Sequence, residues 1–158
     1  MRKLLLLLTI AAITLLLQLL PGSWMTIVDI RPDFVLLGVM LVGRFYGKVW
    51  GQCYGFTVGL LVDALGMGSF LGLSALTKTI AGFGAGFLKN QRHRISPFSY
   101  HVVSLAILFI HFFVYYFINF RGVEIALQVN LLRYMTPATG YTMILYLLVD
   151  YLLPSDLS

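Results

Sequence analysis

From Gly43 to Gly86 the sequence reads GRFYGKVWGQCYGFTVGLLVDALGMGSFLGLSALTKTIAGFGAG. Small residues recur in it at every fourth position. The first series is Gly43, Gly47, Gly51, Gly55 and Gly59, with Asp63 as the next step, and the second is Ser74, Lys78, Gly82 and Gly86. Residues i and i+4 share one face of a helix. The stretch therefore predicts two apolar helices, joined by a turn at residues 66–70, each with a smooth stripe that carries one ionisable group.

The composition is that of a membrane protein. Of the 158 residues, 59% are hydrophobic and only 11% are charged, whereas about 25% are charged in a typical soluble domain. We therefore expect a single-domain integral membrane protein in a lipid bilayer. The net charge of +5 comes from basic residues in short loops between apolar runs, which the positive-inside rule explains without nucleic acid. The single cysteine, Cys53, excludes an internal disulfide and a cysteine metal cluster.

The apolar runs predict an all-α bundle of six transmembrane helices. They cover residues 4–20, 32–46, 49–65, 71–88, 100–120 and 137–153. The second helix is only about 22 Å long, which is short for a hydrocarbon core of about 30 Å. We therefore expect it to lie deep in the bundle or to be shielded by its neighbours. The polar stretch 121–136 is interpreted as a surface helix.

An even number of spans puts both termini on one side of the membrane. With the N-terminus inside, the inner side collects Arg2, Lys3, Arg44, Lys48, Lys89, Arg92 and Arg94. The outer side then holds Arg31, Arg121 and Arg133. This bias predicts that both termini are cytoplasmic in a multi-pass protein.

Asp63 and Lys78 are the candidate intramembrane polar pair. Asp63 comes near the outer end of its helix, and Lys78 leans toward the same level because helical side chains point to their own N-terminus. An unpaired charge in the bilayer costs about 3 kcal/mol or more, so pairing is expected. Such a pair could form a pocket for a ligand or partner, or it could be a purely structural ion pair. Asp63 could instead cap the turn at residues 66–70.

The glycine stripes have two interpretations. The glycines concerned are Gly51, Gly55, Gly59, Gly82 and Gly86. They could allow close packing between helices of this chain, or they could form a docking surface for the transmembrane helix of another protein. A homodimer through the stripes is equally consistent with the sequence.

Arg31, Pro32 and Asp33 form a short polar motif on the predicted outer side. Proline and aspartate suit the first turn of a helix, and the motif could also bind a periplasmic partner. Asp150, near the inner end of the last helix, could pair with Arg44 or Lys48, or it could reach the lipid headgroups. The three histidines have no carboxylates at ligand spacing, and the sequence holds no hydrolase, zinc-protease or nucleotide-binding motif. We therefore expect neither a metal, a cofactor nor a catalytic residue.

Three segments, in this order, resemble the rod-shape-determining protein MreD family of bacterial inner membranes. They are Arg31-Pro32-Asp33, the run GFTVGLLVDALG at residues 55–66, and the run FLGLSAL at residues 70–76, which leads into GFGAG at residues 82–86. The resemblance covers the size, the expected six spans and, in detail, residues 31–88. The C-terminal half is similar only in hydropathy.

The resemblance implies a non-catalytic inner-membrane scaffold of the cell-elongation complex. Proteins of the MreD family act with the bitopic protein MreC, the actin-like MreB and the cell-wall synthases, and they help to direct lateral peptidoglycan synthesis and cell shape. Their fold is similar to the vitamin-binding S-components of energy-coupling-factor transporters. Two alternatives remain open: an S-component-like subunit of a vitamin transporter, and a small channel or ion-coupled transporter that uses Asp63 and Lys78.

Overall fold

The computed structural model describes residues 2–19, 31–68, 70–121 and 127–152. These residues form six α-helices and one short 3-10 turn, and they contain no strand. The elements are α1 (Arg2–Leu19), α2 (Phe34–Tyr46), α3 (Lys48–Ala64), α4 (Leu73–Ala85), η2 (Gly86–Leu88), α5 (Pro97–Asn119) and α6 (Leu127–Leu152). The prediction of an all-α protein is confirmed.

Five of the predicted helices lie within three residues of their observed limits. Residues 20 and 153, the predicted ends of the first and last helices, lie outside the described part of the chain. The prediction for residues 121–136 is wrong for its second half, because α6 already begins at Leu127 and runs without a break through Pro137. Residues 122–126 lie outside the described residues.

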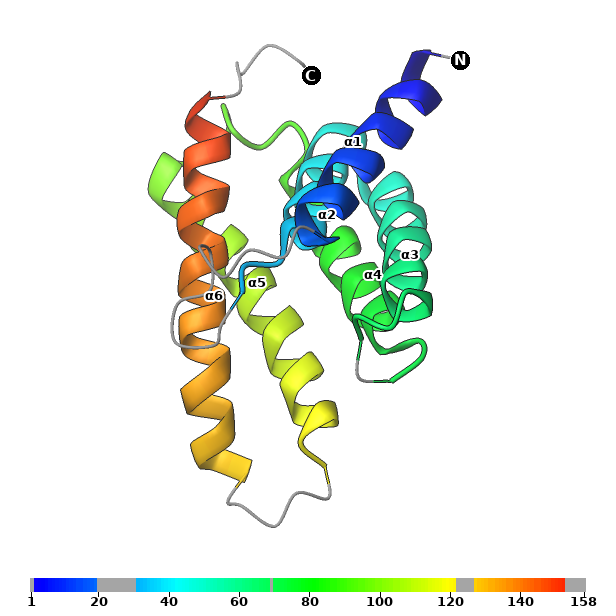
Figure 1. Cartoon of the computed structure of the whole chain (residues 1–158). Coiled ribbons are helices and arrows are strands. Elements are labelled where there is room, and N and C mark those ends of the chain that lie inside the picture. The colour runs from blue at the N-terminus through cyan, green and yellow to red at the C-terminus, as the bar shows by residue number, and fades with distance from the viewer. Residues whose placement is uncertain (1, 20–30, 69, 122–126, 153–158) are drawn as a thin grey trace.

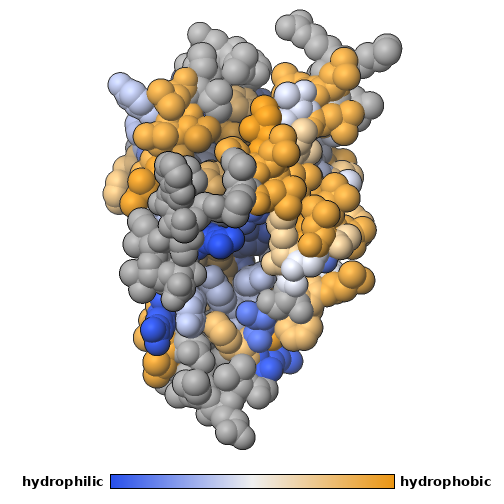
Figure 2. Space-filling view, in the orientation of Figure 1, coloured by the Kyte–Doolittle hydropathy of each residue, from blue (hydrophilic) through white to orange (hydrophobic). Residues whose placement is uncertain are grey.

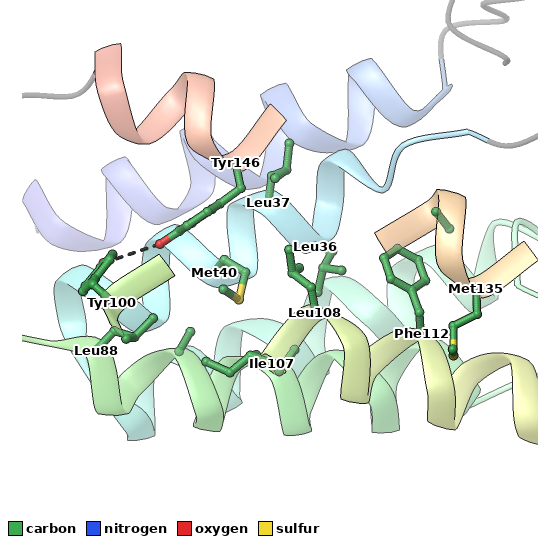
Figure 3. Close-up of a cluster of buried hydrophobic side chains, with 13 residues drawn as sticks. Leu36, Leu37, Met40, Leu88, Tyr100, Ile107, Leu108, Phe112, Met135 and Tyr146 are labelled. Atoms are coloured by element: carbon green, nitrogen blue, oxygen red, sulfur yellow. Dashed lines mark hydrogen bonds between the residues drawn. The ribbon is translucent and has the colours of Figure 1, made fainter. Parts of the chain in front are cut away.

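Helix α2 lies at the centre of the molecule, as its short length predicted. Its side chains Val35, Leu36, Val39, Met40 and Val42 are completely buried. One face of α2 packs with α1 and α3 around Tyr54 and Val58. The opposite face packs with α4, α5 and α6, where Leu36 and Met40 lie among Leu108, Ile107 and Tyr146 (Figure 3). The helix thus joins two halves of one core.

The two ends of the molecule are distinct. The beginning of α1 and the end of α6 lie at one end. The turn between α3 and α4 lies away from it, on the side toward the end of α5 and the beginning of α6 (Figure 1). The loop after η2 also lies at the first end (Figure 1). There Lys89 Nζ donates a hydrogen bond of 3.3 Å to the carbonyl oxygen of Tyr46, the last residue of α2. We call these the terminal end and the turn end.

The outer surface is strongly apolar. Leu5 and Leu8 of α1, Phe109 of α5 and Leu132 and Ile144 of α6 are all more than 45% exposed. Figure 2 shows apolar residues over much of one face. Within the described residues, only α5 is both long and apolar enough to cross a membrane, while Leu5–Leu19, Phe34–Tyr46 and Leu73–Leu88 are shorter apolar helices.

Candidate functional site: a polar pocket at the turn end

Asp33 caps the N-terminus of α2 and forms an ion pair with α4. Its Oδ1 accepts a hydrogen bond of 2.7 Å from the backbone N–H of Leu36, which caps the helix. Its Oδ2 accepts a hydrogen bond of 2.6 Å from Lys78 Nζ, in an ion pair whose side chains are 17% and 3% exposed. Helix α2 begins at Phe34, so Pro32 precedes the cap and does not lie in the first turn as predicted. The expected helix-start role of the motif is confirmed for Asp33.

Asp63 is not the partner of Lys78, and the predicted pair is wrong. The Asp63 carboxylate caps α4: its Oδ2 accepts hydrogen bonds from the backbone N–H groups of Gly72, Ser74 and Ala75 at 2.8, 3.1 and 3.3 Å. The amides at a helix N-terminus carry partial positive charge and attract an anion. The alternative that Asp63 acts as a cap is therefore correct in kind, although the capped element is α4 and not the turn before it.

The conformation of the turn places these amides. Gly72 has φ +91°, a left-handed conformation that only glycine adopts without strain. Its N–H and the first amides of α4 thereby face the end of α3. Asp63 itself is only 6% exposed. Because its carboxylate accepts hydrogen bonds from several backbone N–H groups, its buried charge needs no cation beside it.

The glycine stripes form the interface between α3 and α4. A Cβ atom built at Gly55 would collide with the backbone of Lys78, and one at Gly51 or Gly82 would collide with the backbone of the other helix of the pair. At Gly59 it would lie 2.6 Å from the Ser74 carbonyl oxygen, and at Gly86 it would collide with Lys48. The intramolecular packing interpretation is thus confirmed. This face is occupied by the chain itself and is not a free docking surface.

A pocket of about 120 Å³ opens at the turn end next to the Asp33–Lys78 pair. Its polar lining comes from α1, the segment before α2, α4 and α5: Gln18, Arg31, Asp33, Ser74, Lys78 and His111. The rest of the lining is Val62, Met67, Phe112, Tyr115 and Tyr116. The Tyr115 ring stacks on His111 at 6.4 Å between centroids. Figure 2 shows a hollow near the middle of the face, where hydrophilic residues interrupt the apolar surface.

Two lining residues have a fixed orientation. Gln18 Oε1 accepts a hydrogen bond of 2.9 Å from the backbone N–H of Phe34, which ties α1 to the beginning of α2. His111 is 1% exposed, with Nε2 3.8 Å from Asp33 Oδ2. Among the described residues, its Nδ1 has no hydrogen-bond partner. A buried polar atom without a partner is rare and is found at ligand and water sites.

A second charged cluster lies at the terminal end. Asp150 of α6 is 3% exposed and forms an ion pair with Arg44 of α2. Arg92, from the loop after η2, lies 3.1 Å from the same carboxylate oxygen. The expected pairing of Asp150 with Arg44 is confirmed. The cluster joins α2, the loop after η2 and α6, so it is a structural element.

Gln18 and Tyr115 line the pocket but were not predicted from the sequence. His111 was expected to be structural, and Lys78 was expected to pair with Asp63. Gln18 was open to detection, because it is a lone amide in an otherwise apolar helix. His111 is likewise a lone polar residue within the aromatic run of α5. Among the described residues, no three His, Cys, Asp or Glu side chains come close enough to hold a metal ion.

Comparisons with protein families, curated proteins and solved structures found no match to this chain.

Proposed function

We propose that this protein is a non-catalytic scaffold of the bacterial cell-elongation complex, of the MreD type, in the inner membrane. In this role it spans the membrane six times with both termini in the cytoplasm. It binds an MreC-like bitopic protein and, directly or through the complex, an MreB-like filament and cell-wall synthases.

The observation that carries the proposal is the contact among the three segments that resemble the MreD family. Asp33 of the Arg-Pro-Asp motif binds Lys78, which belongs to none of these segments but lies in α4 between the FLGLSAL and GFGAG runs. Asp63 of the GLLVD segment caps the helix that begins in the GLSAL segment. Glycines of the same segments pack α3 on α4. The shared residues thus form one structural unit around α2, which gives a physical reason for their order and spacing.

A second candidate function is that of an S-component-like subunit of a vitamin transporter. The polar pocket at the turn end favours it, because a ligand site needs a few convergent polar groups. The size of the pocket argues against this function, because about 120 Å³ is well below the roughly 300–1,000 Å³ of common cofactor pockets. The ion-transport alternative assumed that Asp63 and Lys78 act together. In the structure each binds another partner, so this alternative has no support.

The test is a pull-down of the tagged protein from its native membrane in mild detergent, followed by mass spectrometry. The scaffold proposal predicts enrichment of an MreC-like bitopic protein and of cell-wall synthases. A tagged, unrelated multi-pass protein of the same membrane is the control for adhesion. Enrichment of an ATPase pair with a coupling membrane protein would instead favour the vitamin transporter and contradict the scaffold.

The partner surface must differ from the glycine-lined face that the sequence suggested. Gly55 and Gly59 lie against α4, so their substitution disturbs the fold before it affects a partner. Contacts to an MreC-like helix are better sought with photo-activatable residues at exposed positions such as Phe109 and Leu132, which are 46% and 66% exposed. Cross-links at such positions support binding through the outer surface.

A further inference from the structure

We propose that the turn-end pocket binds an oxyanion, a carboxylate or phosphate group, carried by a ligand of which about ten non-hydrogen atoms are enclosed. The inference rests on the pocket alone and holds whichever of the two candidate functions is correct. Failure of the pull-down above would therefore leave it untouched.

The charge balance of the pocket favours an anion. Asp33 is neutralised within the pocket by Lys78, since the two groups lie 2.6 Å apart. Arg31 lines the same pocket and is exposed at its rim. The described lining residues therefore carry two cations, Arg31 and Lys78, and one anion, Asp33. An anionic group bound in the pocket would neutralise the remaining positive charge.

The hydrogen-bonding groups of Arg31, Lys78 and Gln18 also favour an anion, because each presents N–H donors to the pocket. Lys78 Nζ carries three N–H groups, and among the described residues it donates only to Asp33. Gln18 uses its oxygen to bind Phe34 N–H, which leaves its NH₂ group as a donor. Each Asp33 oxygen already accepts one hydrogen bond, from Leu36 N–H and from Lys78. A ligand that supplies acceptors fits these donors, and the hydroxyls of Ser74, Tyr115 and Tyr116 can donate to it as well.

The volume sets the size of the ligand. A water molecule needs roughly 10–15 Å³ of cavity volume. A pocket of about 120 Å³ therefore holds about ten water-sized groups. The rings of Tyr115 and Tyr116, at 85° to each other, provide aromatic surface beside the polar groups. This combination suits a small organic acid with a compact or aromatic body, or a lipid headgroup with the acyl chains outside.

The experiment measures binding of benzoate by saturation-transfer NMR to the full chain in phosphatidylcholine nanodiscs. Benzamide, its neutral isostere, serves as the matched probe. We expect benzoate to bind with a Kd of about 1 mM or lower, and benzamide to bind about tenfold more weakly because it lacks the charge. Equal signals from the two probes, or no benzoate signal, would overturn the proposal.

Two matched variants locate the site. Arg31→Gln removes the exposed cation at the rim and should weaken benzoate binding about tenfold, as expected for loss of a charged hydrogen bond. Arg94→Gln makes the same change at an exposed residue in the loop after η2, at the other end of the molecule, and should have no effect. Unchanged binding in Arg31→Gln, or an equal loss in both variants, would overturn the proposal.

A third arm identifies the source of the oxyanion. The benzoate measurement is repeated in nanodiscs that contain phosphatidylglycerol. Retention of the signal supports a free small acid as the ligand. Its loss, with no such loss on addition of inorganic phosphate to phosphatidylcholine nanodiscs, supports a lipid headgroup in the same site.

Discussion

The Lys78 ammonium lies 2.6 Å from the carboxylate of Asp33, 45 residues earlier in the chain. The bond joins the middle of α4 to the residue that caps α2, and it forms one wall of the turn-end pocket. Because the same carboxylate caps α2 through Leu36 N–H, a single residue fixes both the beginning of the central helix and the position of its neighbour. The stability of the turn end should therefore depend on this pair.

The first prediction concerns the pair itself. Asp33→Asn or Lys78→Met alone should lower the free energy of unfolding by about 3–5 kcal/mol, because each strands a buried charge. The double variant should lose less than the sum of the two, with a coupling of about 0.5–3 kcal/mol. Unfolding in mixed micelles, followed by circular dichroism, measures this. The matched cycle of Asp63→Asn with Lys78→Met should be close to additive, and strong coupling there would contradict the observed partners.

The second prediction concerns the cap on α4. Asp63→Ala should cost about 1–2 kcal/mol for the lost cap, and more if the amides stay buried without an acceptor. Asp63→Asn keeps one acceptor oxygen and should cost less. Hydrogen exchange at the amides of Ser74 and Ala75 should rise more in the alanine variant. Equal exchange in the two variants would argue against a capping role.

The third prediction compares two glycines of different surroundings. Gly55→Leu should prevent stable packing of α3 on α4, because its side chain would meet the Lys78 backbone. Gly140→Leu in α6 should be tolerated, because nothing lies within 4 Å of a Cβ built there. The yield of monodisperse protein and its melting temperature provide the comparison. Similar losses for both would contradict the assignment of the stripe to an interface within the chain.

The fourth prediction separates the two arginines that share Asp150. Arg44→Met should cost about 3–5 kcal/mol, because it leaves a buried carboxylate with less compensation. Arg92→Met should cost less than about 1 kcal/mol, since the Arg92 side chain is 35% exposed and that of Arg44 is 6% exposed. Chemical unfolding of the two variants decides the point. The reverse order would show that Arg92 is the main partner.

The sequence predicted the helices of residues 31–88 well, because their limits depend on local chemistry. Asp33 caps α2, and the turn before α4 holds a left-handed Gly72, so these boundaries follow from short-range signals. The deep position of α2 also followed from its length and composition. The extension of α6 back to Leu127 did not, because Pro137 and the polar residues before it resemble the start of a helix.

The polar contacts between helices were harder to predict. Asp63 and Lys78 were paired because both are charged and lie at a similar depth, yet the backbone amides at the start of α4 are closer partners for Asp63. Lys78 was then free to bind Asp33, and nothing local links residues 45 positions apart. The pocket similarly depends on Gln18 of α1 and His111 of α5, whose approach is decided by packing of the whole bundle.

The proposed role in cell elongation can be tested by depletion of the protein in its native cell. We predict that depleted cells lose their rod shape and that incorporation of a fluorescent peptidoglycan precursor along the side wall falls, with both restored by the wild-type chain. Normal shape and wall labelling in depleted cells, together with a fall in uptake of a vitamin, would contradict the scaffold and favour the transporter subunit.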